Sequence, residues 1–459
     1  MLSRLVPTTI LALVISEIAL AASCYVLAAY LLSDIDPLVW LQYENGFVRI
    51  GVLVAGIVFG IYLQDLYSKF KVASKFLLFQ QICLVLGIAF LFQAFVSYVV
   101  PALVLPKWIM MTGSLMLLVL LPVWRSLYSA QVAKALNSER VLFLGASDVT
   151  LQIAQALTER PEFGLTVAGF VADPPETEKL KEGELLGSIE NFKQIVRDVK
   201  PDRVVVGMVE RRSRMPVLDL LDVNFAGVPV EDAAVAYESV FGRVCTKQLR
   251  PSQLIFSREL GPRPGTMKLQ TVYSFTIASA ILVLGLPVML ILALLVKVTS
   301  PGPVLYRQKR VGLHGRLFTV FKFRSMLKNA EAETGAVWAA REDPRITRFG
   351  GFLRRFRLDE LPQMINVLKG EMAVCGPRPE RPEFVATLSE TIPFYRQRHN
   401  VKPGITGWAQ INHKYGDSME DTVIKLEYDL YYLKNLTPAL DFYILFHTLK
   451  IMLLSRGSQ

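Results

Sequence analysis

The sequence is poor in the residues that build disulfide scaffolds and the commonest metal centres. Its 459 residues include only four cysteines and four histidines. The cysteines are scattered with no paired spacing, which excludes a disulfide scaffold and offers no zinc-binding pattern. The histidines have no HxH or HxxxH spacing, which argues against a histidine-based metal centre. These residues are Cys24, Cys83, Cys245 and Cys375, and His314, His399, His413 and His447.

Apolar residues and positive charge are what the sequence has in excess. Hydrophobic residues make up 52% of the chain and the mean hydropathy is +0.37, which is high for a soluble protein and indicates that part of the chain lies in lipid. The net charge is +10, and residues 300–459 hold 24 lysines and arginines against 16 acidic residues, a net +8. This basic C-terminal third indicates an anionic partner: nucleic acid, a phosphorylated substrate or anionic lipid head groups.

Four apolar stretches occupy the N-terminal third, and each has close to the ~20 residues that a helix needs to span a bilayer. We expect a four-helix transmembrane bundle over residues 1–130, with core helices of a soluble protein as the alternative. The connection at 33–44 is acidic, whereas the connection around 69–75 and the segment after the fourth stretch are basic. The positive-inside rule then places the second and fourth connections in the cytoplasm. The stretches are 7–32, 47–63, 76–100 and 108–127.

Residues 139–256 have the pattern of a small α/β domain. Short β-branched runs alternate with helical patterns, which indicates a Rossmann-like parallel sheet. The first turn, 145–150, keeps a single glycine of the GxGxxG fingerprint that cradles a dinucleotide pyrophosphate. We therefore favour a structural or regulatory module over dinucleotide binding. Residues 257–268, which include the run LGPRPG, indicate a linker.

A fifth apolar segment, 269–299, has Gly285 and Pro287 at its middle. Proline removes a helical hydrogen bond and clashes with the preceding turn, so we expect a sharp bend. Both flanks are basic, and a true fifth span would place a domain of net charge +8 outside the cell, against the positive-inside rule. A re-entrant helix that enters the bilayer, bends at Pro287 and returns satisfies both observations. A kinked transmembrane helix is the alternative.

The adjacent carboxylates Asp359 and Glu360 are the candidate catalytic pair of the basic domain at 300–459. On a helix, neighbouring side chains diverge by about 100°, so the two do not share one proton but can do different work. One can bind a divalent cation or attack phosphorus while the other orients it or handles a proton. Arginines just upstream favour ionised carboxylates. Taken alone, such a pair is more often a solvated helix face.

Longer runs around the pair carry a resemblance. The stretch from Ser300 to about Leu454 resembles the bacterial sugar transferases, also called polyprenyl-phosphate hexose-1-phosphate or monotopic phosphoglycosyl transferases. Residues 425–453 resemble their exopolysaccharide-associated subgroup, and the whole architecture is similar to the large members. The matching runs are SPGPVLYRQKRVG (300–312), FKFRSM (321–326), EDPRITRFG (342–350), FLRRFRLDELPQMINVLKGEMAVCGPRPE (352–380) and KPGITGWAQIN (402–412).

The resemblance implies a reaction and a place for it. A UDP-sugar would donate its sugar 1-phosphate to a polyprenyl phosphate, typically undecaprenyl phosphate, with release of UMP. This would be the first membrane step of exopolysaccharide, capsule or O-antigen synthesis. The fold implied is a multi-domain membrane protein: a transmembrane bundle, a Rossmann-like middle domain, and a mainly helical monotopic catalytic domain with a re-entrant helix. It would lie in the bacterial inner membrane with the catalytic domain on the cytoplasmic face, as a homodimer among membrane lipids, with no nucleic-acid partner.

The resemblance also implies residue roles. Asp359 would be the nucleophile that forms a covalent phosphosugar intermediate, and Glu360 would assist metal binding or activate the lipid phosphate. Both would hold Mg²⁺. Pro287 would be the bend of the re-entrant helix. The implied substrate-binding residues, which contact phosphates or nucleotide, are Lys322, Arg324, Arg354, Arg378 and Glu380.

Two departures from the family pattern limit these inferences. His413-Lys414-Tyr415-Gly416 stands where many members have a Gly-Arg-Asn-type run, so the sugar is not assigned. Arg357 occupies a position where smaller polar residues are frequent. Two other functions remain alternatives: a membrane-tethered nucleotide-sugar dehydratase and a non-enzymatic scaffold or regulator of polysaccharide assembly. The dehydratase would need an intact glycine fingerprint and a Tyr-x-x-x-Lys pair, and the pair noticed at Tyr67 and Lys71 lies in a membrane loop.

Overall fold

The structure is a computed structural model in which the chain forms two compact units, Met1–Ala233 and Ala234–Gln459. Parts of the predicted linker, of the run at 342–350 and of the run at 413–416 lie outside the described residues. The predicted division into five domains stays a prediction. The structure describes residues 8–33, 35–64, 66–67, 75–128, 139–160, 164–180, 184–208, 215–246, 262–327, 345–413 and 418–453.

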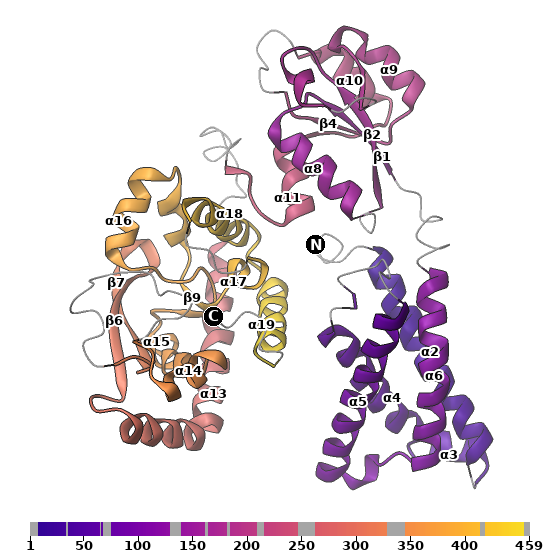
Figure 1. The fold of residues 1–459 in the computed structure, drawn as a ribbon, viewed down its shortest axis with the longest axis vertical. Coiled ribbons are helices and arrows are strands. Elements are labelled where there is room, and N and C mark those ends of the chain that lie inside the picture. The colour runs from indigo at the N-terminus through magenta and orange to yellow at the C-terminus, as the bar shows by residue number, and fades with distance from the viewer. Residues whose placement is uncertain are drawn as a thin grey trace. The chain divides into compact units, whose positions relative to one another are not determined.

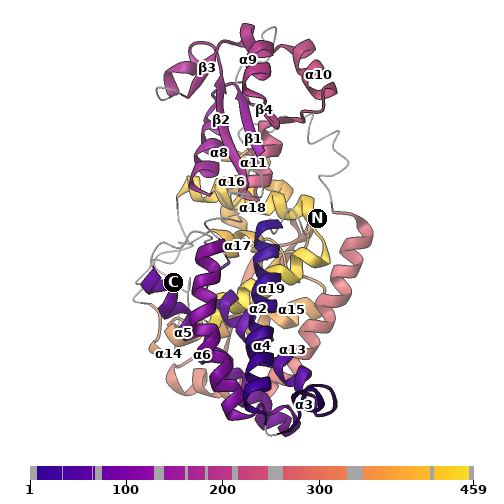
Figure 2. The ribbon, with the colours of Figure 1, turned by 90° about the vertical axis from the view of Figure 1, so that its right-hand side faces the viewer.

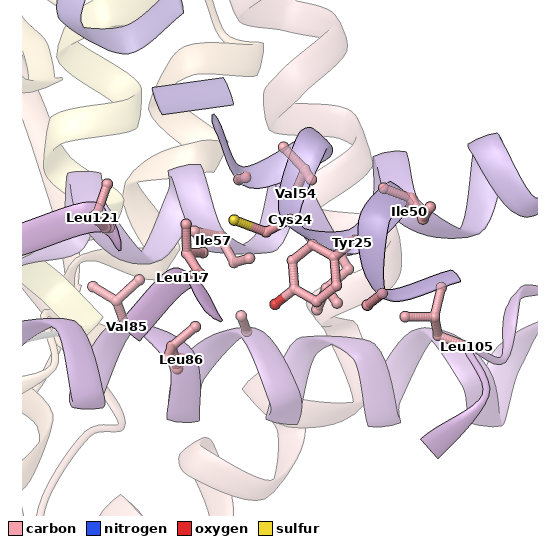
Figure 3. Packing of buried hydrophobic residues seen from close by; sticks show 14 of the residues in the cluster. Cys24, Tyr25, Ile50, Val54, Ile57, Val85, Leu86, Leu105, Leu117 and Leu121 are labelled. Atoms are coloured by element: carbon pink, nitrogen blue, oxygen red, sulfur yellow. The ribbon is translucent and has the colours of Figure 1, made fainter. Parts of the chain in front are cut away.

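The predicted apolar stretches of the N-terminal third all fall on helices. Their inward faces meet in one buried cluster in which Tyr25 is fully buried (Figure 3). The Tyr25 hydroxyl lies 2.7 Å from Ser114 Oγ, and Gly113 leaves room for the ring because a Cβ there would lie 2.3 Å from it. The helices of this part are α2 (Thr8–Leu32), α3 (Pro37–Tyr43), α4 (Gly46–Leu63), α5 (Lys75–Val99) and α6 (Lys107–Leu127).

The outward faces of these helices are also apolar, with exposed side chains such as Ile15, Phe95 and Leu115. A helix that is apolar on all sides needs an apolar medium around it. In the part of the chain that the structure describes, five helices are long and apolar enough to cross a membrane: α2, α4, α5, α6 and α13. The protein is therefore associated with a membrane.

The rest of the first unit is a five-stranded parallel sheet of order β3-β2-β1-β4-β5, as the sequence pattern predicted (Figure 2). Alternate side chains of its central strand β1, Leu142 and Leu144, pack into one cluster with residues of α9 and α10. The elements are β1 (Glu139–Leu144), α8 (Asp148–Glu159), β2 (Leu165–Val171), β3 (Leu185–Gly187), α9 (Phe192–Val199), β4 (Arg203–Val206), α10 (Val217–Phe225) and β5 (Val230–Asp232).

The first turn of this sheet is engaged by the chain's own carboxylate. Ala146 N donates a 2.7 Å hydrogen bond to Glu176 Oε2, in the turn where Rossmann-like domains bind a pyrophosphate. Gly145, at φ 94°, packs against the backbone of Met208. The role of this sheet as a structural or regulatory module stays a prediction.

The second unit contains the last helices, a hairpin and a small parallel pair of strands (Figure 1). The hairpin strands β6 and β7 are antiparallel, with Tyr306 opposite Lys322, and β8 pairs in parallel with β9. The elements are α11 (Ala233–Phe241), α13 (Pro264–Thr299), β6 (Leu305–Val311), β7 (Leu317–Phe323), α14 (Arg348–Arg355), η8 (Leu358–Gln363), α15 (Met364–Leu368), β8 (Ala373–Cys375), α16 (Pro382–Thr391), η9 (Tyr395–Asn400), β9 (Gly404–Thr406), α17 (Trp408–Asn412), α18 (Met419–Asn435) and α19 (Pro438–Leu453).

Helix α13 contains the fifth apolar segment and includes Pro287 in its interior. Figure 1 shows that it changes direction along its length. Its large side chains are mostly exposed, among them Leu284 at 80% and Val298 at 75%. A buried network anchors its first half, where Gln270 and Tyr273 donate hydrogen bonds to the buried Asp441 carboxylate of α19. The first half of α13 is thus fixed to α19 within the second unit, while the rest of the helix presents an apolar surface.

Candidate active site

The candidate catalytic residues lie in η8, a short 3₁₀ helix that packs on α13. Leu358 and Leu361 join a buried cluster with Leu292 and Val296 of that helix. The apolar positions on either side of the Asp-Glu pair therefore fix the carboxylates beside the C-terminal half of the apolar helix. A site built in this way lies where a long apolar helix meets a polar domain.

Asp359 and Glu360 are each only 7% exposed. The helix begins after Arg357, whose φ of 53° lies in the left-handed region that most side chains avoid. The sequence resemblance implies that smaller polar residues are frequent at this position. Small polar residues such as asparagine tolerate the left-handed region far better than arginine.

Glu360 is held by two cations. Lys322 Nζ donates to its Oε1 at 3.0 Å, and Arg378 Nη2 donates to the same oxygen at 2.9 Å. Burial pushes the pKa of Glu360 upward, but the charges of Arg378, Lys322 and Arg357 outweigh burial and hold that pKa well below its usual value. Glu360 is therefore a fixed, ionised carboxylate.

Asp359 has a different environment although it is the next residue. Among the described residues no hydrogen bond to its carboxylate is formed. Burial raises the pKa of Asp359 and the adjacent Glu360 charge raises it further, while Lys322, Arg354 and Arg378 oppose that rise. The pair thus consists of one carboxylate locked in ion pairs and one left available for chemistry.

The other predicted substrate-binding residues fall at varied distances from this pair. Arg354 lies close enough for its charge to act on Asp359, and its Nε donates to Ser325 Oγ at 2.9 Å. Arg324 is buried and donates to the carbonyls of Ser300 and Pro303, which follow α13, at 2.6 and 2.5 Å. Its predicted role in substrate binding stays a prediction.

Glu380, the remaining member of the predicted set, lies next to Arg310. Its Oε2 is 3.5 Å from Arg310 Nη1, and its carbonyl accepts from Val311 N at 3.0 Å. The structure therefore brings Lys322, Arg378 and Glu360 into direct contact, and Glu380 lies against Arg310 and Val311 of β6.

A further ion pair that the sequence did not reveal supports Arg378. Arg398, 6% exposed, donates to Asp429 Oδ2 at 2.7 and 3.0 Å and to the backbone carbonyl of Arg378 at 3.0 Å. Asp429 is 2% exposed. The two residues are 31 positions apart on different elements, so no local pattern signals their pairing.

His399, the neighbour of that arginine, is a buried histidine near the same segment. It lines a small hollow together with Arg378, Arg398 and Pro379. Its Nε2 is buried and has no hydrogen-bond partner among the described residues. Burial, together with the charge of Arg398, lowers the pKa of His399 from 6.5 to about 4. The ring is therefore neutral at physiological pH.

This shift predicts a pH dependence of stability. Because the folded pKa is below the unfolded one, the contribution of His399 is fully present above pH 6.5 and is lost as the pH falls through about 4. We expect the thermal midpoint of the wild type to fall over this range more steeply than that of His399→Asn, which does not titrate there. Parallel acid dependence of the two proteins in melting experiments would contradict the prediction.

The pair has a donor set that fits magnesium. In the described ranges no group of three or more His, Cys, Asp and Glu side chains gathers as an all-protein metal site. Magnesium in phosphoryl-transfer sites, however, is usually held by one or two carboxylates together with substrate phosphates and water. The Asp359 carboxylate lacks a hydrogen-bond donor among the described residues and has a raised pKa, so a neighbouring cation would supply the missing countercharge.

Two family models match the chain. Residues 266–455, which contain the whole site, match the model described as bacterial sugar transferase, and residues 57–211 match the model described as CoA-binding domain. Residues 212–265 belong to neither match. The two matched regions correspond to the catalytic part of the second unit and, in part, to the sheet of the first.

Several bacterial proteins are similar to the chain in sequence. A UDP-N-acetylgalactosamine-undecaprenyl-phosphate N-acetylgalactosaminephosphotransferase of Aeromonas hydrophila is 40% identical over 263 residues, 53% of this chain and 60% of the relative. A UDP-glucose:undecaprenyl-phosphate glucose-1-phosphate transferase of Klebsiella pneumoniae is 33% identical over 318 residues, 68% of this chain and 67% of the relative. The exopolysaccharide production protein PSS of Rhizobium leguminosarum bv. phaseoli is 42% identical over 188 residues, 40% of this chain and 93% of the relative. The chain thus spans 60% of the length of the first relative.

Proposed function

The chain belongs to the bacterial sugar transferase family, and from this premise we propose that it transfers a sugar 1-phosphate from a UDP-sugar to undecaprenyl phosphate or a similar polyprenyl phosphate. The observation that carries the proposal is the buried Asp359-Glu360 pair, with Glu360 clamped by Lys322 and Arg378 against the apolar helix α13. A site of this kind can serve a water-soluble diphosphate and a lipid phosphate in turn.

The proposed reaction has two displacements at one phosphorus atom. An Asp359 oxygen attacks the sugar-bearing phosphorus of the donor, the bond between that phosphorus and the bridging oxygen breaks, and its electron pair leaves with UMP. An oxygen of the polyprenyl phosphate then attacks the same phosphorus, and the Asp359 carboxylate leaves. The product is a lipid-linked diphosphosugar, and the carboxylate is regenerated.

The cationic side chains stabilise the charge that develops on the transferring group. Lys322 and Arg378 hold Glu360 on one side, and Arg354 acts on Asp359. Asp359 and Glu360 would hold Mg²⁺, which neutralises phosphate charge when bound. Fixed charges in a site that excludes water stabilise the transition state more than the same charges do in solution.

The proposed setting is the cytoplasmic face of the bacterial inner membrane. Nucleotide sugars are water-soluble, and the basic second unit suits the side of the membrane that attracts positive charge. The product would be the first lipid-linked intermediate of a surface polysaccharide. We also propose that the protein is a homodimer. The sugar is left open, because relatives named for N-acetylgalactosamine and for glucose are both similar to the chain.

The function is tested by incubating the purified protein with a panel of UDP-sugars, undecaprenyl phosphate and magnesium, and measuring UMP. We expect UMP with at least one sugar and a lipid product that contains it. A chain that releases no UMP with any of the sugars is not such a transferase.

The proposed re-entrant course of α13 has its own test. Cys83 is the exposed native cysteine and is replaced by serine, since Cys24, Cys245 and Cys375 are buried. Thr299→Cys then places a thiol at the exposed end of α13. We expect a membrane-impermeant maleimide to label it only in broken cells, whereas Glu44→Cys, in the predicted external connection, is labelled in intact cells. Labelling of Thr299→Cys in intact cells would show a complete span.

A further inference from the structure

A segment between the two family matches reaches into the catalytic part. We define the strap as residues Ala234–Thr246, which follow β5 of the α/β sheet in the chain and lie in the second unit. The two family models match residues 57–211 and 266–455, and the strap lies between these regions. It contacts α17, α18 and their surroundings, the elements that support Arg378.

Glu427 of α18 is the centre of these contacts. It is 5% exposed, and its Oε1 accepts hydrogen bonds from Thr246 N at 3.0 Å and Thr246 Oγ1 at 2.8 Å. Its Oε2 accepts from Tyr237 Oη at 3.3 Å and lies 3.5 Å from Arg243 Nε. Every partner in this set comes from the strap. A buried carboxylate with these donors makes the position of α18 depend on the strap.

Three more contacts secure the strap. Val244 is 3% exposed and belongs to a core cluster with residues of α16 and α18. Trp408 Nε1 donates to the carbonyl of Gly242 at 2.6 Å, and Lys434 Nζ lies 2.9 Å from Glu238 Oε2. The strap is thus built into the core of the catalytic part and does not lie on its surface.

Helix α18 provides the first connection from the strap to the donor site. Asp429 is two residues after Glu427 on the same helix, and it holds the guanidinium of Arg398. Arg398 in turn donates to the carbonyl of Arg378, whose side chain donates to Glu360. Apart from the chain itself, each link of this series is a hydrogen bond between buried or partly buried groups.

Helix α17 provides the second connection. Trp408, which holds the strap, follows Gly407, and a Cβ on Gly407 would lie 2.2 Å from the carbonyl oxygen of Gly376. Gly376, two residues before Arg378, donates its backbone N–H to the carbonyl of Thr406 at 2.9 Å. This backbone contact leaves no room for the two segments to move independently.

We propose that the strap is a positioning element of the donor site. The proposal rests on the function proposed above. The strap bonds Glu427 and Trp408 directly, so a change in the strap reaches these two residues first. Because both connections end at Arg378, the expected consequence is weaker binding of the nucleotide diphosphate.

The test variant is the double substitution Tyr237→Phe and Thr246→Val, which removes two hydroxyl donors to Glu427 and keeps side-chain volume. We expect KM for the UDP-sugar to rise about tenfold or more, with KM for the lipid unchanged, since small displacements of a positioning group cost up to ~100-fold. The single variant Thr246→Ser, with Tyr237 unchanged, retains both hydroxyl donors and should have the wild-type KM for the UDP-sugar. Ser239→Ala is the matched control, because its hydroxyl bonds to Ala236 of its own helix.

Hydrogen–deuterium exchange gives a readout that does not depend on activity. In the double variant, we expect faster exchange in peptides covering 373–378 and 404–407, and no such change in Ser239→Ala. A variant that melts at lower temperature but keeps wild-type exchange in these peptides and wild-type KM for the donor would show that the strap is only structural. If the wild type itself releases no UMP, the function proposal fails, and the exchange result still decides whether the strap positions the Arg378 segment.

Discussion

Asp359→Asn is expected to reduce UMP formation by at least about a thousandfold, because removal of a covalent nucleophile has effects of this size or greater. The amide keeps the shape of the side chain but is not a nucleophile toward phosphorus. Glu360 does not replace it, since Lys322 and Arg378 both hold its Oε1. Initial rates of UMP release, measured at saturating donor and lipid, give the result.

The same substitution should not weaken the fold. Asp359 is a buried carboxylate beside a second buried carboxylate, and its pKa is raised for these two reasons. A neutral amide removes both costs, so we expect the thermal midpoint in the absence of metal to be unchanged or higher. Asp198→Asn, an exposed carboxylate of α9, is the matched control and should keep full activity. A variant Asp359→Asn with more than about a tenth of wild-type activity would contradict the nucleophile assignment.

Arg398→Met is expected to have the largest effect on stability. It leaves Asp429, which is 2% exposed, without its cation, and breaking a buried pair in this way costs about 3–5 kcal/mol. Burial already raises the pKa of Asp429 against the opposing charge of Arg398. A carboxyl with a raised folded pKa destabilises at pH values above that pKa, so the loss should be greatest at neutral pH and smaller in acid. Thermal melting in detergent across this pH range measures it.

A double variant separates the structural from the positioning role of this pair. In Arg398→Met with Asp429→Leu, both charges are replaced by apolar groups, and stability should return close to that of the wild type. Activity should stay low, because the carbonyl of Arg378 has lost the donor at 3.0 Å that fixes it. If the double variant regains both stability and activity, Arg398 has no positioning role for Arg378.

The elements that the sequence predicts well are those with local causes. Runs of apolar residues predicted the long helices, and alternating β-branched runs predicted the parallel sheet, because period and length alone fix these elements. The acidic pair and its cations were identified through long ordered motifs, in which Lys322 and Arg378 were already named beside Glu360. The structure adds that both cations hold the same carboxylate oxygen.

Contacts between distant segments were not accessible to the same reasoning. Arg398 and Asp429 are separated by 31 positions, and Thr246 and Glu427 by 181, so their pairing depends on the assembled fold. The strap lies within the range predicted for the middle domain, and its contacts group it with the second unit. Arg324, a predicted substrate-binding residue, follows the last residue of β7, and its guanidinium donates to the carbonyl of Ser300 at the end of α13.

The covalent role of Asp359 can be tested most directly by withholding the lipid. With UDP-sugar and magnesium alone, the two-displacement reaction predicts a burst of about one UMP per active site, and a phosphosugar adduct on the peptide that contains Asp359. Addition of undecaprenyl phosphate should then release the adduct as lipid-linked product. A wild-type enzyme that forms no UMP and no adduct until the lipid is present, yet turns over with it, would contradict the account.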